Sequence, residues 1–235
     1  MDDPNDIDFG QWAPLHRAAT NVRAPATRLP SLPCLTGHRY ADMRCCSVRS
    51  ILQGHVGMVK LLIKHGAELE ANAGKEWRTP LMLAAKRGHA EAVKMLAEAG
   101  ADTEYHSGNG LTPLMEAASS GRNSETHAAT VGSLIEAGAD VSRENYVNGN
   151  TALHYAAVTG NLQSAKLLVA AGANITAENQ EGYTPMDYAN KHTWNYDMRV
   201  WFRELGAECT LGEHCRDDSG GRPQPPKATS RKIEL

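Results

Sequence analysis

Two short motifs recur along this sequence with one shared spacing. The first is a Thr followed by Pro or Ala and then apolar residues; it begins at Thr79, Thr112, Thr151 and Thr184, and a related segment begins at Ala13. The second is Gly-Ala, which recurs in steps of 34, 38, 34 and 34 residues, at Gly66, Gly100, Gly138, Gly172 and Gly206. Because two independent motifs share a period of about 33 residues, the chain is built from structural repeats.

Each repeat has the pattern of two short helices. The Thr hydroxyl can cap the free N–H groups of a helix, and Pro fits its first turn. An Ala-rich helix follows, as at Leu83-Ala84-Ala85, and a turn residue such as Gly88 separates it from a second helix. The Gly of the Gly-Ala motif can end that second helix in the left-handed conformation. A unit of this size cannot bury its apolar face alone, so the repeats must stack into a solenoid.

The order of these motifs resembles the ankyrin repeat family over roughly residues 8–208. The resemblance implies an all-α repeat solenoid of paired antiparallel helices joined by β-hairpin-like loops. It places a repeat domain at residues 1–208 and a disordered tail at 209–235. The five expected repeats are 8–73, 74–107, 108–145, 146–178 and 179–208.

The third and fifth repeats depart from the pattern. The third has extra residues at 122–126, which we expect in the turn between its helices. In the fifth, Asp187 replaces the His of the signature, and Trp201-Phe202 replace the usual apolar pair. We expect this repeat to cap the stack, with its large aromatic residues facing inward and Arg199 and Arg203 facing outward.

Residues 22–53 interrupt the first repeat. Without them, the flanking residues join into an uninterrupted repeat unit. The segment has five Arg, one Asp and no Lys or Glu, and it begins with Val22 and ends with Gln53, whose codons can supply the GT and AG ends of an intron. We hypothesise that it is a retained intron, and sequencing of the spliced transcript would decide between this and a functional loop.

The sequence offers little for catalysis. The resemblance implies that His16 and His154, at the fourth position of the signature, hydrogen-bond within and between repeats. Met82 and Met115 occupy the same position in other repeats, and a shared acid–base function would not tolerate Met. Motifs for an activated Ser, a phosphate loop or a metalloprotease helix are absent from the sequence. We therefore expect a protein that is not an enzyme and has no cofactor.

Metal binding is also weakly supported. Cys45 and Cys46 are adjacent, without a paired His cluster, and Cys209, His214 and Cys215 form an incomplete zinc site. We expect no bound metal, and we interpret the cysteines of the tail as free thiols.

Composition limits the remaining partners. The formal net charge of −3 is too small to indicate nucleic-acid binding by itself, and no apolar run approaches the roughly 20 residues of a membrane helix. The first six residues are acidic and polar, unlike a secretory signal. We expect a monomer in the cytoplasm or nucleus that binds neither nucleic acid, membrane nor a small-molecule substrate.

The expected function is that of a protein-binding scaffold or adaptor. The resemblance implies that partners contact the tips of the hairpin loops and the concave face of the first helices. The candidate residues on that surface are Trp12, Trp77, Arg78, Lys86, Arg87, Leu111, Tyr146, Asn150 and Tyr183. The alternative is a targeting or substrate-recruiting module of a larger enzyme complex, and the identity of the partner stays open.

Overall fold

A computed structural model describes residues 54–71, 76–121, 124–191 and 195–210 of this chain. Several predictions fall on other residues and lie outside the described part. They concern Trp12, His16, the first helix of the first repeat, the insertion at 22–53 and the tail from residue 211 onward.

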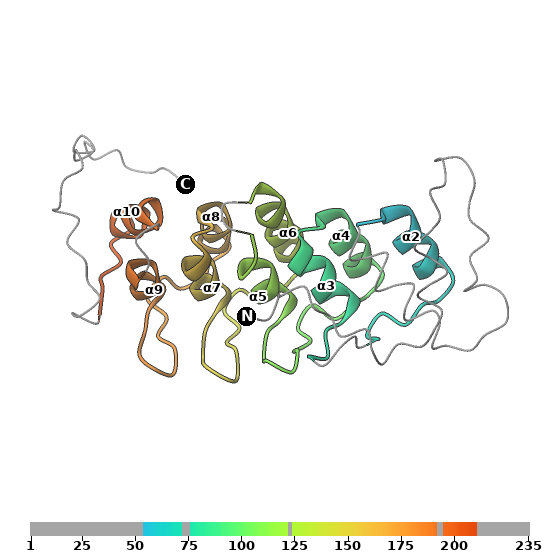
Figure 1. The fold of residues 1–235 in the computed structure, drawn as a ribbon, viewed down its shortest axis with the longest axis horizontal. Helices are drawn as coiled ribbons and strands as arrows, with labels where there is room; N and C mark the ends of the chain where they lie inside the picture. Colours follow the sequence, from blue (N-terminus) through green and yellow to red (C-terminus); the bar gives the residue numbers. More distant parts are fainter. Residues whose placement is uncertain (1–53, 72–75, 122–123, 192–194, 211–235) are drawn as a thin grey trace, which may run out of the picture.

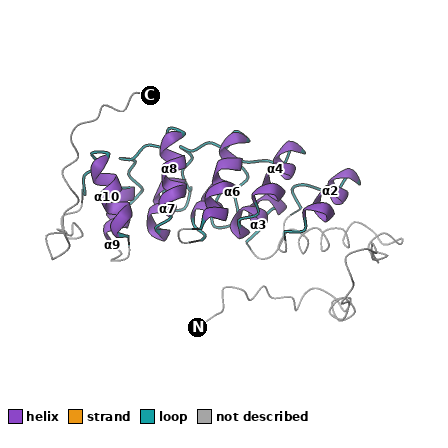
Figure 2. Cartoon of the chain, turned by 90° about the horizontal axis from the view of Figure 1, so that it is seen from above, coloured by secondary structure: helices purple, strands orange, loops and turns teal. Residues whose placement is uncertain are grey.

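Helices stack in two rows along one axis (Figures 1 and 2). The inner row contains α3 (Pro80–Arg87), α5 (Pro113–Ala118), α7 (Ala152–Thr159) and α9 (Pro185–Lys191). The outer row contains α2 (Val56–Lys64), α4 (Ala90–Glu98), α6 (Glu125–Glu136), α8 (Leu162–Ala170) and α10 (Tyr196–Glu204). The loops that lead from an outer helix to the next inner helix all extend to one side (Figure 1). This arrangement confirms the predicted all-α solenoid of paired helices.

Local signals set the ends of the inner helices. The hydroxyls of Thr79 and Thr112 accept hydrogen bonds from the backbone N–H groups of Met82 and Met115, at 3.4 and 3.3 Å. At the other end of α3, Gly88 adopts a left-handed conformation with φ +74°. These are the capping roles that the Thr and Gly motifs predict.

The core runs continuously between the two rows. The inner helices contribute pairs of fully buried alanines, such as Ala84-Ala85 and Ala156-Ala157, and the outer helices contribute Leu96, Leu134 and Leu168. The small alanine side chains let neighbouring helices approach closely. Each inner helix packs against the next one in the row, from α3 to α9.

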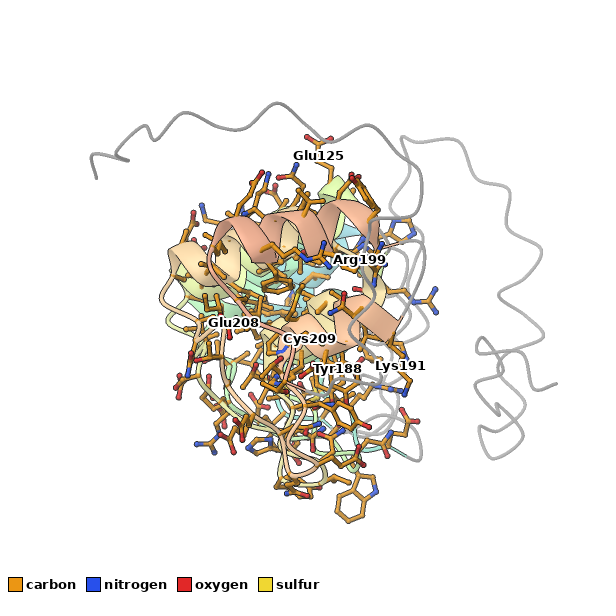
Figure 3. All side chains as sticks on the ribbon, turned by 90° about the vertical axis from the view of Figure 1, so that its left-hand side faces the viewer. Glu125, Tyr188, Lys191, Arg199, Glu208 and Cys209 are labelled. Atoms are coloured by element: carbon orange, nitrogen blue, oxygen red, sulfur yellow. The ribbon has the colours of Figure 1, made fainter. Side chains whose placement is uncertain are left out.

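The fifth helix pair only partly follows the prediction of inward aromatic residues and outward arginines. Phe202 is fully buried and Arg203 is exposed, but Arg199 is only 5% exposed, so its predicted outward orientation is wrong. The reason is helical geometry: Arg199 precedes Phe202 by three residues and therefore shares its buried face. Figure 3 shows Arg199 on α10, on the side facing α9.

The extra residues of the third repeat are partly helical. We predicted that 122–126 lie in the turn, but α6 begins at Glu125 and has 12 residues, against nine in α4 and α8. The insertion thus lengthens the start of α6 by almost one turn. The added turn contains His127, whose Nε2 lies 3.1 Å from the carbonyl oxygen of Lys86 and links two repeats.

At the last described repeat, Asp187 binds the segment that follows α10. Its carboxylate accepts hydrogen bonds from the backbone N–H and hydroxyl of Thr184, at 2.8 and 2.7 Å, and from the same two groups of Thr210, at 3.0 and 2.7 Å. Burial raises the pKa of Asp187, but these hydrogen bonds outweigh it and bring the pKa below its ordinary value of 3.8. An acceptor is needed here because the segment that covers α9 offers N–H and O–H donors.

We expect Asp187→Asn to lower the free energy of unfolding by about 2 kcal/mol at neutral pH, because hydrogen bonds to a charged group are the strongest of their kind. The stabilisation by the carboxylate is present above pH 3.8 and is lost as the pH falls through its lowered pKa. Urea unfolding of both proteins at pH 7 measures the difference. Thr210→Val should reproduce part of it, and an unchanged unfolding midpoint in Asp187→Asn would contradict this role.

Cys209 and Thr210 belong to the structured part of the chain, although we assigned them to the tail. Cys209 Sγ lies 3.2 Å from Asp187 Oδ1, next to α9 (Figure 3). Cys209 is disulfide-bonded, so its interpretation as a free thiol is wrong.

The described helices are all too short or too polar to cross a membrane.

Candidate partner-binding surface

The hairpin loops form a row in which neighbouring loops are hydrogen-bonded to each other. The N–H of Gly108 donates to the carbonyl oxygen of Glu76 at 2.7 Å, and the N–H of Gln180 donates to that of Asn148 at 3.1 Å. Closer to the outer helices, Glu70 and Glu104 each accept from a backbone N–H of the following loop, at 2.8 and 2.9 Å. These contacts hold the tips in fixed relative positions, so the loops present a preorganised surface.

Three large apolar side chains project from this row. Trp77 is 62% exposed, Tyr146 59% and Val147 56%, and we call them the hairpin-tip patch. The Tyr146 hydroxyl donates to the carbonyl oxygens of Ser107 and Gly108, at 3.3 and 3.4 Å. Ser107 and Gly108 belong to the loop between the one that carries Trp77 and the one that carries Tyr146 and Val147. Because the N–H of Gly108 also donates to the carbonyl oxygen of Glu76, this middle loop contacts both loops that carry the patch. Exposed aromatic residues on a fixed backbone are typical of protein-binding surfaces.

Trp77 has a backbone conformation that a Trp seldom adopts. Its φ of +53° is the only positive value among the described non-glycine residues. Aligned on the following Thr, the other loops place Gly110, Gly149 and Gly182 at this position, with φ of +75°, +73° and +78°. A side chain in the left-handed region costs roughly 1–2 kcal/mol, and most of the indole ring is exposed. The fold therefore favours Gly at this position, and Trp77 is a candidate for a functional residue.

The next loop has small residues where it approaches the backbone before Trp77, and a Cβ added at Gly108 would lie 3.4 Å from the carbonyl oxygen of Glu76. That loop has Ser107 and Gly108 where the following loops have Asn145-Tyr146 and Asn179-Gln180. In contrast, a side chain added at Gly110 would lie 2.3 Å from Asn145 Oδ1. The substitution of Trp for Gly is visible when the repeats are aligned, but its meaning depends on the backbone angle.

Arg78 lies beside the patch and is held in ion pairs. Its Nε lies 2.5 Å from Glu116 Oε1 on α5, and its Nη1 contacts Glu76. The side chain of Arg78 is 17% exposed and that of Glu116 is 2% exposed. Arg78 thus has a structural partner in addition to any role in binding.

The remaining predicted residues have different environments. Asn150 is 5% exposed, and its Oδ1 accepts from Asn179 at 2.8 Å, so it does not face solvent. Leu111 and Tyr183 are half-buried. Lys86 and Arg87 lie at the end of α3 that is farthest from its hairpin loop, with Lys86 half-buried and Arg87 exposed. The structure therefore brings Trp77 and Tyr146 to one edge and adds Val147, which the sequence analysis missed.

Val147 is exposed because it lies at the second position of a hairpin tip, where Asn109 and Glu181 are also exposed in the neighbouring loops. The loop that carries Val147 is also one residue longer than these neighbours. Five residues, 146–150, separate Asn145 from Thr151, whereas four separate Ser107 from Thr112 and Asn179 from Thr184. The irregular spacing of the repeats thus has two sources, the longer α6 and this extra loop residue.

His154 has the structural role that we expected. Its Nδ1 accepts from the backbone N–H of Thr151 at 3.1 Å, and its Nε2 donates to the carbonyl oxygen of Tyr183 in the next loop at 3.0 Å. The ring is fully buried, and this burial lowers the pKa of His154 below its ordinary value of 6.5. Neutral His154 thus links two repeats.

We expect the contribution of His154 to stability to decrease as the pH falls below 6.5. In that range the unfolded chain binds a proton more readily than the folded chain does, and the resulting loss of stability is at most about 1.4 kcal/mol at one pH unit below. The measurement is urea unfolding at pH 7.5 and 5.5, with His154→Gln as the comparison, since Gln keeps one donor and one acceptor but does not titrate. An equal pH dependence in both proteins would contradict the prediction.

The described residues contain no group of three His, Cys, Asp or Glu side chains arranged to hold a metal ion.

Stacked helix pairs with a fixed row of hairpin tips define a helical repeat protein of the kind that binds other proteins. The sequence comparisons agree with this class. The chain belongs to the ankyrin repeat family, because residues 43–145 and 123–211 match ankyrin repeats in three copies.

Its relatives combine such repeats with different activities. The human ankyrin repeat and SOCS box protein 16 is 32% identical over 211 residues, which cover 85% of this chain and 46% of that protein. The human palmitoyltransferase ZDHHC13 is 39% identical over 140 residues, or 60% of this chain and 22% of that enzyme. The rice potassium channel AKT3 is 35% identical over 111 residues, or 47% of this chain and 11% of the channel. This chain spans less than half the length of these relatives.

Proposed function

We propose that this chain is a non-catalytic scaffold or adaptor that binds a partner protein through its hairpin-tip patch and the adjoining concave face. The observation that carries the proposal is Trp77. It is a mostly exposed aromatic residue in a left-handed conformation, at a position where the other described loops have Gly. Trp and Tyr dominate the binding energy of many interfaces, especially when the backbone that carries them is already ordered.

The ankyrin family match supports protein binding in general. The choice of surface rests on this chain's own residues. Of the predicted residues, Trp77 and Tyr146 are central to the proposed surface, with Val147 added. Arg87, Leu111 and Tyr183 are accessible enough to contribute at its margins. Trp12 extends the same proposal beyond the described residues.

A second candidate function is that of a targeting or substrate-recruiting module in a larger enzyme complex. Similarity to part of a palmitoyltransferase favours this candidate, because that enzyme carries related repeats in addition to the rest of its chain. The full-length transcript distinguishes the two functions, since a catalytic domain encoded in the same message would support the second.

Affinity capture from the native cell tests the proposed surface, with the full chain and its Trp77→Gly variant as baits. Proteins identified by mass spectrometry with the full chain are then purified and titrated against both baits. A partner that binds the full chain and is lost from Trp77→Gly supports the proposal. Equal binding by both baits would show that the partner contacts another surface.

A further inference from the structure

The row of hairpin loops is strongly acidic. Its described residues, 65–71, 76–79, 99–112, 137–151 and 171–184, contain nine Asp and Glu and two Arg, so their formal charge is 2 − 9 = −7. The other described residues contain nine Asp and Glu and nine Lys and Arg, so their formal charge is 9 − 9 = 0. The negative charge is therefore concentrated at this one edge, which we call the hairpin edge.

The two arginines of the hairpin edge are already paired. Arg78 contacts Glu76 and Glu116, and Arg143 Nε lies 3.9 Å from Glu104 Oε2. They therefore neutralise individual glutamates and leave the remaining negative charge of the edge in place.

Exposed carboxylates adjoin the apolar patch. Glu144 is exposed and lies two residues before Tyr146 in the same loop. Glu181 is exposed in the next loop, at the position that Val147 occupies in its own loop. Apolar contacts are thus available beside negative charges on neighbouring tips.

The opposite ends of the inner helices carry positive charge, from Lys86 and Arg87 on α3 and Lys191 on α9 (Figure 3 shows Lys191). The adjoining first turns of α4 and α6 carry Glu91 and Glu125, so this side has mixed charge. The excess negative charge of the hairpin edge would attract a positively charged segment, because complementary potentials steer association.

We infer that the hairpin edge binds a protein segment in which one or two large apolar side chains are flanked by Lys or Arg. This inference rests on the proposed function and specifies the chemistry of the partner. The apolar side chains pack on Trp77, Tyr146 and Val147, and the basic side chains lie near Glu144 and Glu181. The aromatic contacts supply most of the affinity. The charges favour segments that contain Lys or Arg and raise the association rate.

Selection from a library of random peptides of about 12 residues, displayed on phage, tests the inference with the immobilised full chain. We expect the enriched peptides to combine Trp, Phe or Leu with nearby Lys or Arg. Synthetic copies should bind the Glu144→Lys/Glu181→Lys variant about tenfold or more weakly than the unmodified chain. Raising NaCl from about 50 to about 500 mM should weaken binding to the unmodified chain by a similar factor.

The matched control is Glu91→Lys/Glu125→Lys, which makes the same change of charge at exposed positions in the first turns of α4 and α6. Figure 3 shows Glu125 on the side of the molecule away from the hairpin loops. Peptide affinity should change less than twofold in this variant. An equal loss in the control and test variants would overturn the inference, because net charge alone would then explain the result.

Binding to Trp77→Gly separates the two proposals. Enriched peptides that depend on Trp77 but are acidic or uncharged would overturn the partner chemistry and leave the proposed surface intact. If no enriched peptide depends on Trp77, the proposed surface itself fails. Self-association of the full chain that Trp77→Gly abolishes, measured by sedimentation velocity, would also overturn the inference, because a second copy would then be the occupant.

Discussion

Arg78→Ala is expected to lower the free energy of unfolding by about 3 kcal/mol, because it leaves the carboxylate of Glu116 buried without its cation. The side chain of Glu116 is 2% exposed, and its Oε1 lies 2.5 Å from Arg78 Nε. When one member of a buried ion pair is removed, the other charge stays buried without compensation. The resulting loss of stability is larger than the net stabilisation that the intact pair provides. Urea unfolding at neutral pH measures the loss.

The repeats themselves supply the control for this prediction. Leu111 stands at the position of Arg78 in the next loop, and Leu83 stands at the position of Glu116 in the preceding inner helix. We therefore expect Arg78→Leu/Glu116→Leu to be substantially more stable than Arg78→Ala, because a buried ion pair can often be replaced by apolar residues of similar volume. A loss below about 1 kcal/mol in Arg78→Ala would show that water solvates Glu116.

Trp77→Gly is expected to weaken partner binding by about 2 kcal/mol, or roughly 30-fold, with little change in stability. The substitution removes the largest exposed aromatic side chain of the hairpin-tip patch. It also relieves a left-handed backbone strain of roughly 1–2 kcal/mol, which offsets the packing lost from the buried part of the ring. Calorimetric titration with the captured partner and thermal unfolding of the free chain measure the two effects.

Trp77→Ala distinguishes backbone from side-chain effects. Both variants remove the ring, but Ala retains the cost of the left-handed conformation, so Trp77→Ala should be about 1 kcal/mol less stable than Trp77→Gly. Their partner affinities should be equal. If Trp77→Gly retained full affinity, or if its affinity loss followed a loss of stability, Trp77 would have no direct role in recognition.

The consequence for binding studies is that Trp77 and Arg78 should be tested separately. The sequence places them side by side before one signature and suggests a common role. In the structure, Trp77 faces solvent while Arg78 holds Glu116, 38 residues away. A loss of binding in Arg78→Ala could follow from a disturbed α5, whereas the same loss in Trp77→Gly points to the surface.

His154 and Asp187 occupy the same position of the repeat, but the sequence pattern does not explain why the residue differs. The sequence shows that the fifth repeat has Asp at the position of His, and its departure from the pattern suggested a cap. The structure supplies the reason: His154 donates to the carbonyl oxygen of Tyr183, whereas Asp187 accepts from Thr210. Which type of group is required depends on whether the covering segment offers acceptors or donors.

The repeat, the helix pairs and the solenoid can be predicted from the amino-acid sequence, because these follow from short-range signals. A capping Thr, a turn Gly and adjacent alanines act within a few residues, and their recurrence forces the units to stack. The packing of the repeats is needed to show that Asn150 is buried, that Arg78 is paired, that Val147 is exposed and that Trp77 has a left-handed backbone. The first two depend on residues of other repeats, the exposure of Val147 on its place at the tip of a loop, and the conformation of Trp77 on a backbone angle that residue identity does not specify.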